Sequence, residues 1–292
     1  MPLALPSLAK INLFLHVPAK RPDGFHEVRT LMLPIGLADE LTFDLLDEPR
    51  IDLTCSEPSL PTDKRNLVFR AATLLQSRHA TTRGARIHLK KNAPIGAGLG
   101  AGSSNGSVTL TGLNRLWNLN LADSVLETLA GEFGSDTAFF VRCQPALSEG
   151  RGEILTPVDF PHRLPIFLMN FGFGSATAWA YKNYRVQPDP HPLSSQEYVR
   201  QAIAVWERSD PSAVAGVLRN DLERPVFEKF PVLHLGREFL LAQPQVLGAM
   251  MCGSGSTLMA ILRSAGQGPA LETAVRREFG PKIWTWLGST QN

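Results

Sequence analysis

The sequence predicts an α+β fold. In the first half, residues 9–17 and 85–91 alternate apolar and polar side chains as strands do, whereas residues 66–78 place apolar side chains at helical spacing. In the second half, strands and helices follow one another around glycine turns, which favours an antiparallel sheet with helices on one face. The chain has 292 residues, 43% of them hydrophobic, enough for two modest domains or one large one.

The same patterns predict the remaining elements. Further strands are expected at residues 28–35, 40–46, 51–54, 166–170, 246–250, 258–262 and 283–287. Further helices are expected at residues 106–117, 122–133, 176–184, 195–208, 211–219, 231–242 and 269–279. Residues 157–165 begin and end with proline and resemble a hinge, so we predict domains at 1–160 and 161–292.

Composition excludes several classes of function. The formal net charge is +2, so strong attraction to nucleic acid or to a membrane surface is not expected. The three cysteines, Cys55, Cys143 and Cys252, are odd in number and far apart, which fits neither a disulfide framework nor a metal-ligand pair and indicates a reducing compartment. The N-terminus has no signal-like region, and no apolar run reaches the roughly 20 residues that span a bilayer. We expect a cytoplasmic protein of bacterial type, a monomer or weak homodimer.

A glycine-rich stretch is the main candidate for a binding site. It reads Pro94-Ile-Gly-Ala-Gly-Leu-Gly-Ala-Gly-Ser-Ser-Asn105, with glycine at every second position from Gly96 to Gly102. Glycine permits positive φ and close approach of the backbone to a ligand. A helix is expected to follow, with Ser103 or Ser104 as its N-cap. A glycine-rich loop that opens onto a helix N-terminus binds anions, and phosphate is the expected guest. A flexible glycine turn without a ligand is the alternative.

Known phosphate-binding loops can be tested against these residues. A Walker A loop requires a lysine after its last glycine, and none follows here. A dinucleotide-binding loop requires G-x-G-x-x-G, but the last position is Ala101 or Ser103, depending on the first glycine chosen. A protein kinase would carry H-R-D and D-F-G strings, and the sequence has neither.

Three polar features outside this loop have both functional and purely structural explanations. Lys10 and Asn12 share one face of the strand at 9–17, which could be a catalytic surface or a solvated polar face. Phe25 and His26 follow a turn and could stack on a flat ring or cover the core. Asp136 enters an apolar run, where a carboxylate is costly unless it is bonded or used, although a turn or helix cap would also explain it.

Taken together, these residues resemble the GHMP family of small-molecule kinases. The glycine loop is similar to the second motif of the family, P-x-G-x-G-L-G-S/G-S-S. The other two motifs occur in order, as Ser7-Leu-Ala-Lys-Ile-Asn-Leu-Phe-Leu15 and Met251-Cys-Gly-Ser-Gly-Ser-Thr-Leu-Met259. The resemblance implies a two-domain fold, with an N-terminal ATP domain like domain 2 of ribosomal protein S5 and a ferredoxin-like C-terminal substrate domain.

Within the family the sequence is most similar to the branch that phosphorylates a methylerythritol carrying cytidine diphosphate, in the non-mevalonate isoprenoid route. The strings that carry this similarity are Ala9-Lys-Ile-Asn-Leu13, Arg21-Pro-Asp-Gly-Phe-His26, Gly134-Ser-Asp136, Glu149-Gly-Arg-Gly-Glu153 and Thr177-Ala-Trp-Ala-Tyr-Lys182. A kinase for homoserine or mevalonate is the first alternative, and Phe25 and His26 argue against it because those substrates have no flat base. A non-catalytic sensor is the second, although it would be expected to lack Lys10 or Asp136.

The resemblance also implies roles for individual residues. Lys10 and Asp136 would be catalytic, with Asp136 accepting the proton of the attacking 2-hydroxyl and Lys10 holding that hydroxyl. ATP, with Mg²⁺, would be the co-substrate, and Ser104 is a candidate magnesium contact. The residues expected to bind ATP are Asn66, Lys91, Pro94, Gly96, Ala97, Gly98, Leu99, Gly100, Ala101, Gly102, Ser103 and Ser104. Those expected to bind the cytidine-containing substrate are Asn12, Phe25, His26, Arg151, Thr177 and Tyr181.

Three departures from the family pattern bear on these roles. Relatives usually carry tyrosine at the position of Phe25, so stacking is kept and a hydroxyl is lost. Ala101 replaces a common glycine, which is harmless if its φ is negative. Thr137 and Ala138 replace a usual Val-Pro, which could change how firmly Asp136 is held.

Overall fold

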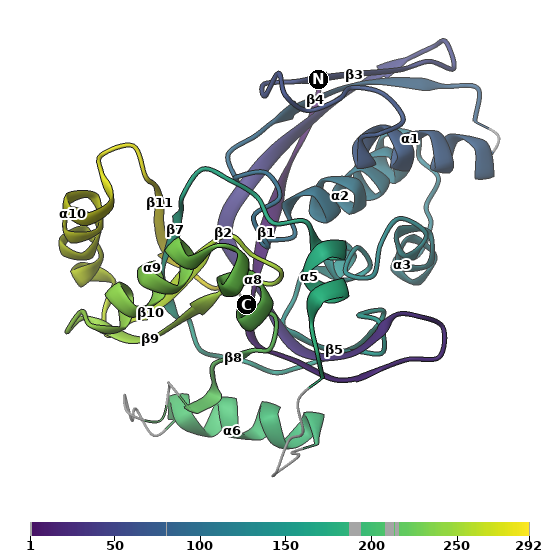
Figure 1. The fold of residues 1–292 in the computed structure, drawn as a ribbon. Helices are drawn as coiled ribbons and strands as arrows, with labels where there is room; N and C mark the ends of the chain where they lie inside the picture. The colour runs from purple at the N-terminus through teal and green to yellow at the C-terminus, as the bar shows by residue number, and fades with distance from the viewer. Residues whose placement is uncertain (1, 80, 187–193, 208–212, 214–215, 292) are drawn as a thin grey trace. The chain divides into compact units, whose positions relative to one another are not determined.

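The computed structural model of the chain describes residues 2–79, 81–186, 194–207, 213 and 216–291 (Figure 1). Contacts between residues divide the chain into two compact, interleaved units. The first unit is made of Met1–Ala9, Leu37–Ala93 and Gly100–Gln144, and the second of Lys10–Gly36, Pro94–Leu99 and Pro145–Asn292. The boundary predicted after residue 160 lies inside the second unit, and as a division into domains it stays a prediction.

The first unit is a sheet covered by helices. Strand β3 (Ile51–Cys55) pairs in parallel with β4 (Gly84–Lys90), which pairs antiparallel with the second half of β2 (His26–Leu46). The helices of this unit are α1 (Leu67–Arg78), α2 (Ala101–Leu116), α3 (Asp123–Gly131) and α4 (Phe139–Arg142). Apolar side chains from these strands and from α1, α2 and α3 form one buried core. The mixture of parallel and antiparallel pairs is a feature that the sequence patterns did not predict.

The start of α2 corrects a prediction. The N-cap of this helix is Gly100, with a φ of 66°, and neither Ser103 nor Ser104 caps it because both lie inside its first turn. The helix therefore begins five residues before the predicted start at 106, directly at the end of the glycine loop. Ala101 is its first residue and is not among the residues with positive φ, so the glycine that relatives carry there is dispensable.

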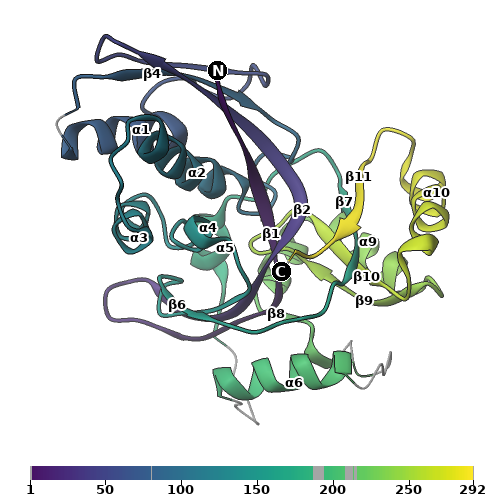
Figure 2. The ribbon, with the colours of Figure 1, turned by 180° about the vertical axis from the view of Figure 1, so that it is seen from behind.

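The second unit contains a four-stranded antiparallel sheet, as predicted for the second half of the chain (Figure 2). The strand order is β11 (Trp284–Ser289), β7 (Pro165–Asn170), β10 (Leu258–Leu262) and β9 (Val246–Met251). Helices α9 (Pro231–Leu241) and α10 (Gly268–Phe279) contribute Leu233, Leu240, Leu271 and Val275 to the core against this sheet. Each of these helices has a proline at its first or second residue. Proline is favourable there because a backbone N–H at that position would have no partner within the helix.

The rest of the second unit is built on two long strands. Strand β1 (Leu3–Lys20) leads into β2 through a turn in which the Arg21 amide donates to the Phe25 carbonyl at 2.8 Å. The first half of β2 pairs with β5 (Ala146–Glu149), which pairs with β6 (Ile154–Pro157). Strand β8 (Arg219–Asn220) runs parallel to β1. The strands predicted separately at 28–35 and 40–46 are a single strand, which continues through Gly36 and Asp39 without a turn.

Further helical segments lie in the second unit. They are α5 (Thr177–Asn183), α6 (Ser195–Glu207), α8 (Glu223–Lys229) and the 3₁₀ turn η1 (Ala265–Gln267). Four of the nine residues in the helix predicted at 211–219 lie outside the described residues. Residues 213, 216 and 217 are helical, and Arg219 belongs to β8. No helix in the described part of the chain is long and apolar enough to cross a bilayer.

Candidate functional site

Lys10 lies on β1, in the second unit, and hydrogen bonds hold its side chain in place. Its Nζ donates to Asn12 Oδ1 at 2.9 Å and to the Gly98 carbonyl at 3.1 Å, and its backbone amide donates to the Leu99 carbonyl at 2.9 Å. Lys10 is 5% exposed and Asn12 is 2% exposed. The alternation of the strand does bring the two side chains to one face, but that face is buried and is not a solvated surface.

The end of the glycine loop packs against the third motif within the same unit. Gly98 has a φ of +79°, and a Cβ on it would lie 1.9 Å from the Cys252 carbonyl oxygen. A Cβ on Gly253 would lie 2.7 Å from the Gly98 carbonyl oxygen and 3.2 Å from Lys10 Nζ. Only glycine allows the two backbones and the ammonium group to come this close. Residues from all three sequence motifs therefore meet at Lys10.

Further hydrogen bonds fix the loop from two sides. The Thr257 amide donates to the Ala97 carbonyl at 3.2 Å, and the Ser175 amide donates to the Gly96 carbonyl at 3.0 Å. The side chains of Thr177 and Ser254 lie 2.8 Å apart, which ties the first residue of α5 to the third motif. Thr177 thus lies beside the loop of the third motif, and its contact with substrate stays a prediction.

Asn220 is a residue that the sequence analysis missed. Its Nδ2 donates to the carbonyls of Met251 and Gly253, at 2.7 and 2.8 Å, and so holds the third motif in place. No pattern in the sequence marks this position, because its partners lie more than thirty residues further along the chain. Cys252, in the same motif, is fully buried, which raises the pKa of its thiol to about 12, so it stays protonated.

Aromatic rings gather at the turn between β1 and β2. The rings of His26 and Tyr181 lie 5.5 Å apart, and the Arg151 guanidinium lies 5.0 Å from the centre of the Phe25 ring. Phe25 is 52% exposed, more than most large apolar side chains of the chain. Burial, with the nearby charge of Lys20, lowers the pKa of His26, so its imidazole is neutral at pH 7. A neutral imidazole has one donor and one acceptor, which suits the edge of a nucleobase.

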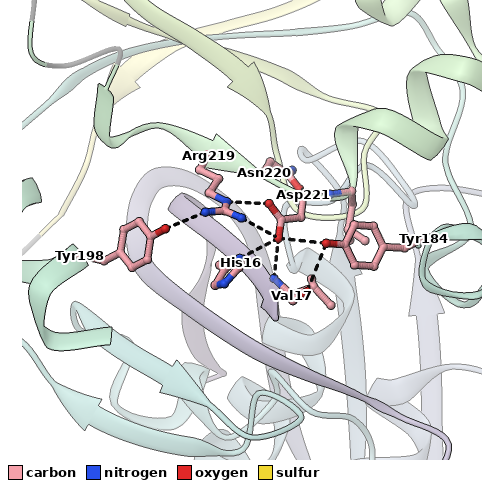
Figure 3. A network of polar contacts seen from close by, with 8 residues as sticks. His16, Val17, Tyr184, Tyr198, Arg219, Asn220 and Asp221 are labelled. Carbon is pink, nitrogen blue, oxygen red and sulfur yellow. Dashed lines mark hydrogen bonds and ion pairs between the residues drawn. The ribbon is translucent and has the colours of Figure 1, made fainter. Parts of the chain in front are cut away.

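A polar network joins β1 to β8 and to the residue that follows it (Figure 3). Asp221 Oδ2 accepts hydrogen bonds from His16 Nδ1 and from the Val17 amide, both at 2.8 Å, and Asp221 Oδ1 accepts one from Arg219 Nε at 2.7 Å. The Tyr184 hydroxyl lies 3.2 Å from Asp221 Oδ2, and the Tyr184 ring lies 6.2 Å from the ring of His26. Through the Tyr184 ring, the network therefore extends to His26, one of the predicted substrate-binding residues.

Asp136 lies in the first unit, in a turn just before α4, and is half-buried. The Thr137 hydroxyl makes hydrogen bonds to the carbonyls of Gly134 and Ala130, at 2.6 and 2.5 Å, and the Ser107 hydroxyl donates to the Thr137 carbonyl at 2.6 Å. These bonds fix the turn that carries Asp136. Within the described residues, no hydrogen bond or ion pair engages the Asp136 carboxylate, which leaves it available for chemistry.

Asn66 and Lys91, both predicted to line the adenine pocket, have structural partners in the first unit. Asn66 caps α1 through a hydrogen bond from the Val68 amide at 2.9 Å. Lys91 forms a buried ion pair with Asp39, whose carboxylate also accepts hydrogen bonds from the Ala93 amide at 3.0 Å and from Asn105 Nδ2 at 3.0 Å. Their binding roles stay predictions.

Ser104 is fully buried, and its Oγ accepts a hydrogen bond from Ser7 Oγ at 2.8 Å. Its role as a magnesium contact stays a prediction. Among the residues that the structure describes, no group of three or more His, Cys, Asp or Glu side chains could hold a metal ion.

The predicted site residues thus fall into two sets. The second unit holds the following predicted residues: Lys10, Asn12, Phe25, His26, Pro94, Gly96, Ala97, Gly98, Leu99, Arg151, Thr177 and Tyr181. The first unit holds the following: Asn66, Lys91, Gly100, Ala101, Gly102, Ser103, Ser104 and Asp136. Each set is described in its own unit, and in the second unit Lys10, Asn12 and the loop are in direct contact.

Comparison with known proteins agrees with these motifs. Residues 66–144 match the family model described as GHMP kinases N terminal domain. The chain is 39% identical, over 284 residues, to 4-diphosphocytidyl-2-C-methyl-D-erythritol kinase of Nostoc sp. strain PCC 7120, with 92% of this chain and 89% of the relative covered.

Solved structures give the same result at the level of the fold. A crystal structure of 4-(cytidine 5'-diphospho)-2C-methyl-D-erythritol kinase superposes with a TM-score of 0.83 at 30% identity, covering 99% of this chain and 100% of the other. Mevalonate kinase of L. major, solved with R-mevalonate, has a TM-score of 0.73 at 17% identity, covering 99% of this chain and 97% of the other. The second similarity concerns the fold alone.

Proposed function

Because the chain belongs to the 4-diphosphocytidyl-2-C-methyl-D-erythritol kinases of the GHMP kinase family, we propose that it phosphorylates the 2-hydroxyl of 4-diphosphocytidyl-2-C-methyl-D-erythritol with ATP. This reaction belongs to isoprenoid precursor synthesis. The observation that carries the proposal is the meeting of Lys10, Gly98 and Gly253, one residue from each kinase motif. A cytoplasmic location and a monomeric or weakly dimeric state remain predictions.

In the proposed reaction the substrate 2-hydroxyl oxygen attacks the γ-phosphorus of ATP. A new P–O bond forms, the bond from the γ-phosphorus to the β–γ bridging oxygen breaks, and ADP leaves. Asp136 accepts the hydroxyl proton, which its carboxylate can do because no described residue occupies it. The buried ammonium of Lys10 orients the hydroxyl and stabilises charge on the transferring oxygens. Positioning and electrostatics dominate such loose transition states, so a base of ordinary strength suffices.

The glycine loop supplies the binding part of the mechanism. Positive φ at Gly96, Gly98 and Gly100 turns successive backbone segments, and α2 begins at the end of the loop. A helix N-terminus offers amide groups and a favourable dipole to phosphate. Since Ser104 is buried, we propose that Mg²⁺ enters with ATP and takes most of its ligands from the phosphates and water.

We propose that cytidine recognition belongs to the aromatic cluster of the second unit. Phe25 offers an exposed ring, Tyr181 lies beside His26, and His26 is neutral. Stacking on an aromatic ring contributes about 1–3 kcal/mol per base. Homoserine and mevalonate have no ring to use this surface, and therefore serve as comparison substrates.

The test is turnover of ATP with the cytidine substrate, beside homoserine and mevalonate, by the parent protein and Asp136→Asn. We expect the parent protein to turn over the cytidine substrate but not homoserine or mevalonate. In Asp136→Asn, turnover should fall about 100-fold or more while ATP binding is retained. Asp123→Asn, an exposed carboxylate in α3 of the same unit, is the matched control and should behave like the parent. Turnover of Asp136→Asn within a few-fold of the parent would contradict its role as the base.

A further inference from the structure

The side chain of Thr30, on β2, continues the chain of hydrogen bonds that begins at Lys10. Asn12 Nδ2 donates to Thr30 Oγ1 at 2.7 Å, and Thr30 Oγ1 donates to the Phe14 carbonyl at 2.6 Å. Together with the bond from Lys10 Nζ to Asn12 Oδ1 at 2.9 Å, these contacts form one continuous series. All of these residues lie in the second unit.

The series has only one possible direction. The Lys10 ammonium can only donate, so Asn12 must present its oxygen to it and its NH₂ group to the other side. The Thr30 hydroxyl accepts a hydrogen bond from that NH₂ group. It donates its own hydrogen bond to a backbone carbonyl, which can only accept. Thr30 therefore determines which way the Asn12 amide faces. With the amide reversed, its NH₂ group would point at the ammonium, and the bond to Lys10 would be lost.

Burial makes this orientation costly to lose. Lys10, Asn12 and Thr30 are 5%, 2% and 4% exposed, so water cannot replace a missing partner at low cost. The cross-strand partner of Thr30 on its other side is Ser148 of β5, which fixes the backbone of Thr30 in the sheet. The hydroxyl is thus held rigidly, as the support of a reacting group should be.

We propose that Thr30 is a positioning residue for phosphoryl transfer, acting through Asn12 to hold the Lys10 ammonium in its reactive orientation. The proposal rests on the role proposed above for Lys10. Thr30 acts through its hydrogen bond with Asn12, and its effect belongs to the catalytic step.

The experiment compares Thr30→Val, which keeps the shape and removes the hydroxyl, with Thr30→Ser, which restores the hydroxyl. We expect kcat of Thr30→Val to fall about 10-fold with KM for ATP within about 2-fold, because misplacement of a reacting group slows the chemical step. Thr30→Ser should recover most of kcat. Thr42→Val, in the same strand, is the control for the substitution itself and should keep the parent kcat.

Two further readouts separate the possible outcomes. If Lys10→Met loses turnover while Thr30→Val keeps the parent kcat, the proposal for Thr30 is overturned and the role of Lys10 stands. If Lys10→Met keeps turnover, the role proposed for Lys10 is contradicted, and the proposal for Thr30, which rests on it, is overturned as well. A loss of kcat in Thr30→Val that matches a fall in the folded fraction, measured by circular dichroism at the assay temperature, would mean a purely structural role and would also overturn the proposal.

Discussion

His16 donates a hydrogen bond from Nδ1 to Asp221 Oδ2 at 2.8 Å, and this contact joins β1 to the residue that follows β8 (Figure 3). Both side chains are nearly inaccessible to solvent, at 4% and 9% exposure. Burial by itself raises the pKa of Asp221, but hydrogen bonds from His16, Arg219 and a backbone amide outweigh it and lower the pKa to about 2.

Asp221→Asn should therefore destabilise the protein at neutral pH. The pKa falls from 3.8 to about 2, which corresponds to about 2 kcal/mol of folding free energy from the ionised carboxylate. Because the folded pKa is the lower one, this contribution is complete above pH 3.8 and is lost as the pH falls toward 2. Urea unfolding at pH 7, and again near the lower pH limit of the folded protein, measures it.

Glu228→Gln is the control for Asp221→Asn, since Glu228 pairs with Arg224 at 3.3 Å on the exposed face of α8. Its effect should stay below about 0.5 kcal/mol. Equal urea midpoints for the two variants at pH 7 would show that the Asp221 network contributes no more than a surface pair.

Gly98→Ala should disrupt the glycine loop. The added Cβ would lie 1.9 Å from the Cys252 carbonyl oxygen, and φ at this position is +79°. Relieving that overlap requires the backbone to move, and the left-handed conformation alone costs about 1–3 kcal/mol. We expect a lower urea midpoint and a KM for ATP raised at least about 10-fold.

The control for this substitution is Gly131→Ala, at the last residue of α3, where a Cβ would meet nothing within 4 Å. Alanine favours helix over glycine by about 1 kcal/mol, so this variant should be as stable as the parent or more so. If Gly98→Ala bound ATP as the parent does, the close approach of the loop to the third motif would have no part in nucleotide binding.

Binding of the cytidine substrate should depend on pH through His26. Its pKa lies below the usual 6.5, because of burial and then the charge of Lys20, so the neutral imidazole persists to a lower pH than in an ordinary histidine. We expect KM for the cytidine substrate to rise as the pH falls below neutrality, with the midpoint of the rise below pH 6.5. In His26→Gln the KM should be higher and nearly independent of pH over this range. A rise in the KM of the parent protein with its midpoint above pH 6.5 would assign the effect to another group.

Local patterns predicted most of the secondary structure. The strand predicted at 258–262 is β10, with the same bounds, and the helix predicted at 66–78 is α1 together with its cap, Asn66. Such elements follow from side-chain periodicity and capping, which are local. The start of α2 was missed because a glycine with positive φ took the capping position that serine usually occupies.

The candidate site could be predicted only in part, because only some of its contacts are local in the sequence. Lys10 and Asn12 were found together because strand alternation relates residues two apart. Thr30 and Asn220 were not, because their partners come from other strands and loops. The ion pair of Lys91 with Asp39 was also missed, since 52 residues separate the two and nothing local connects them.

The Arg151 guanidinium over the Phe25 ring has a consequence for the discovery of inhibitors. A flat compound that stacks on the covered face of this ring must first displace the guanidinium, at a cost of about 0.5–1 kcal/mol for an exposed pair. A compound with an anionic group beside its ring would keep the arginine as a partner and avoid that loss. Screening libraries against this protein should therefore favour acidic aromatic scaffolds over neutral ones.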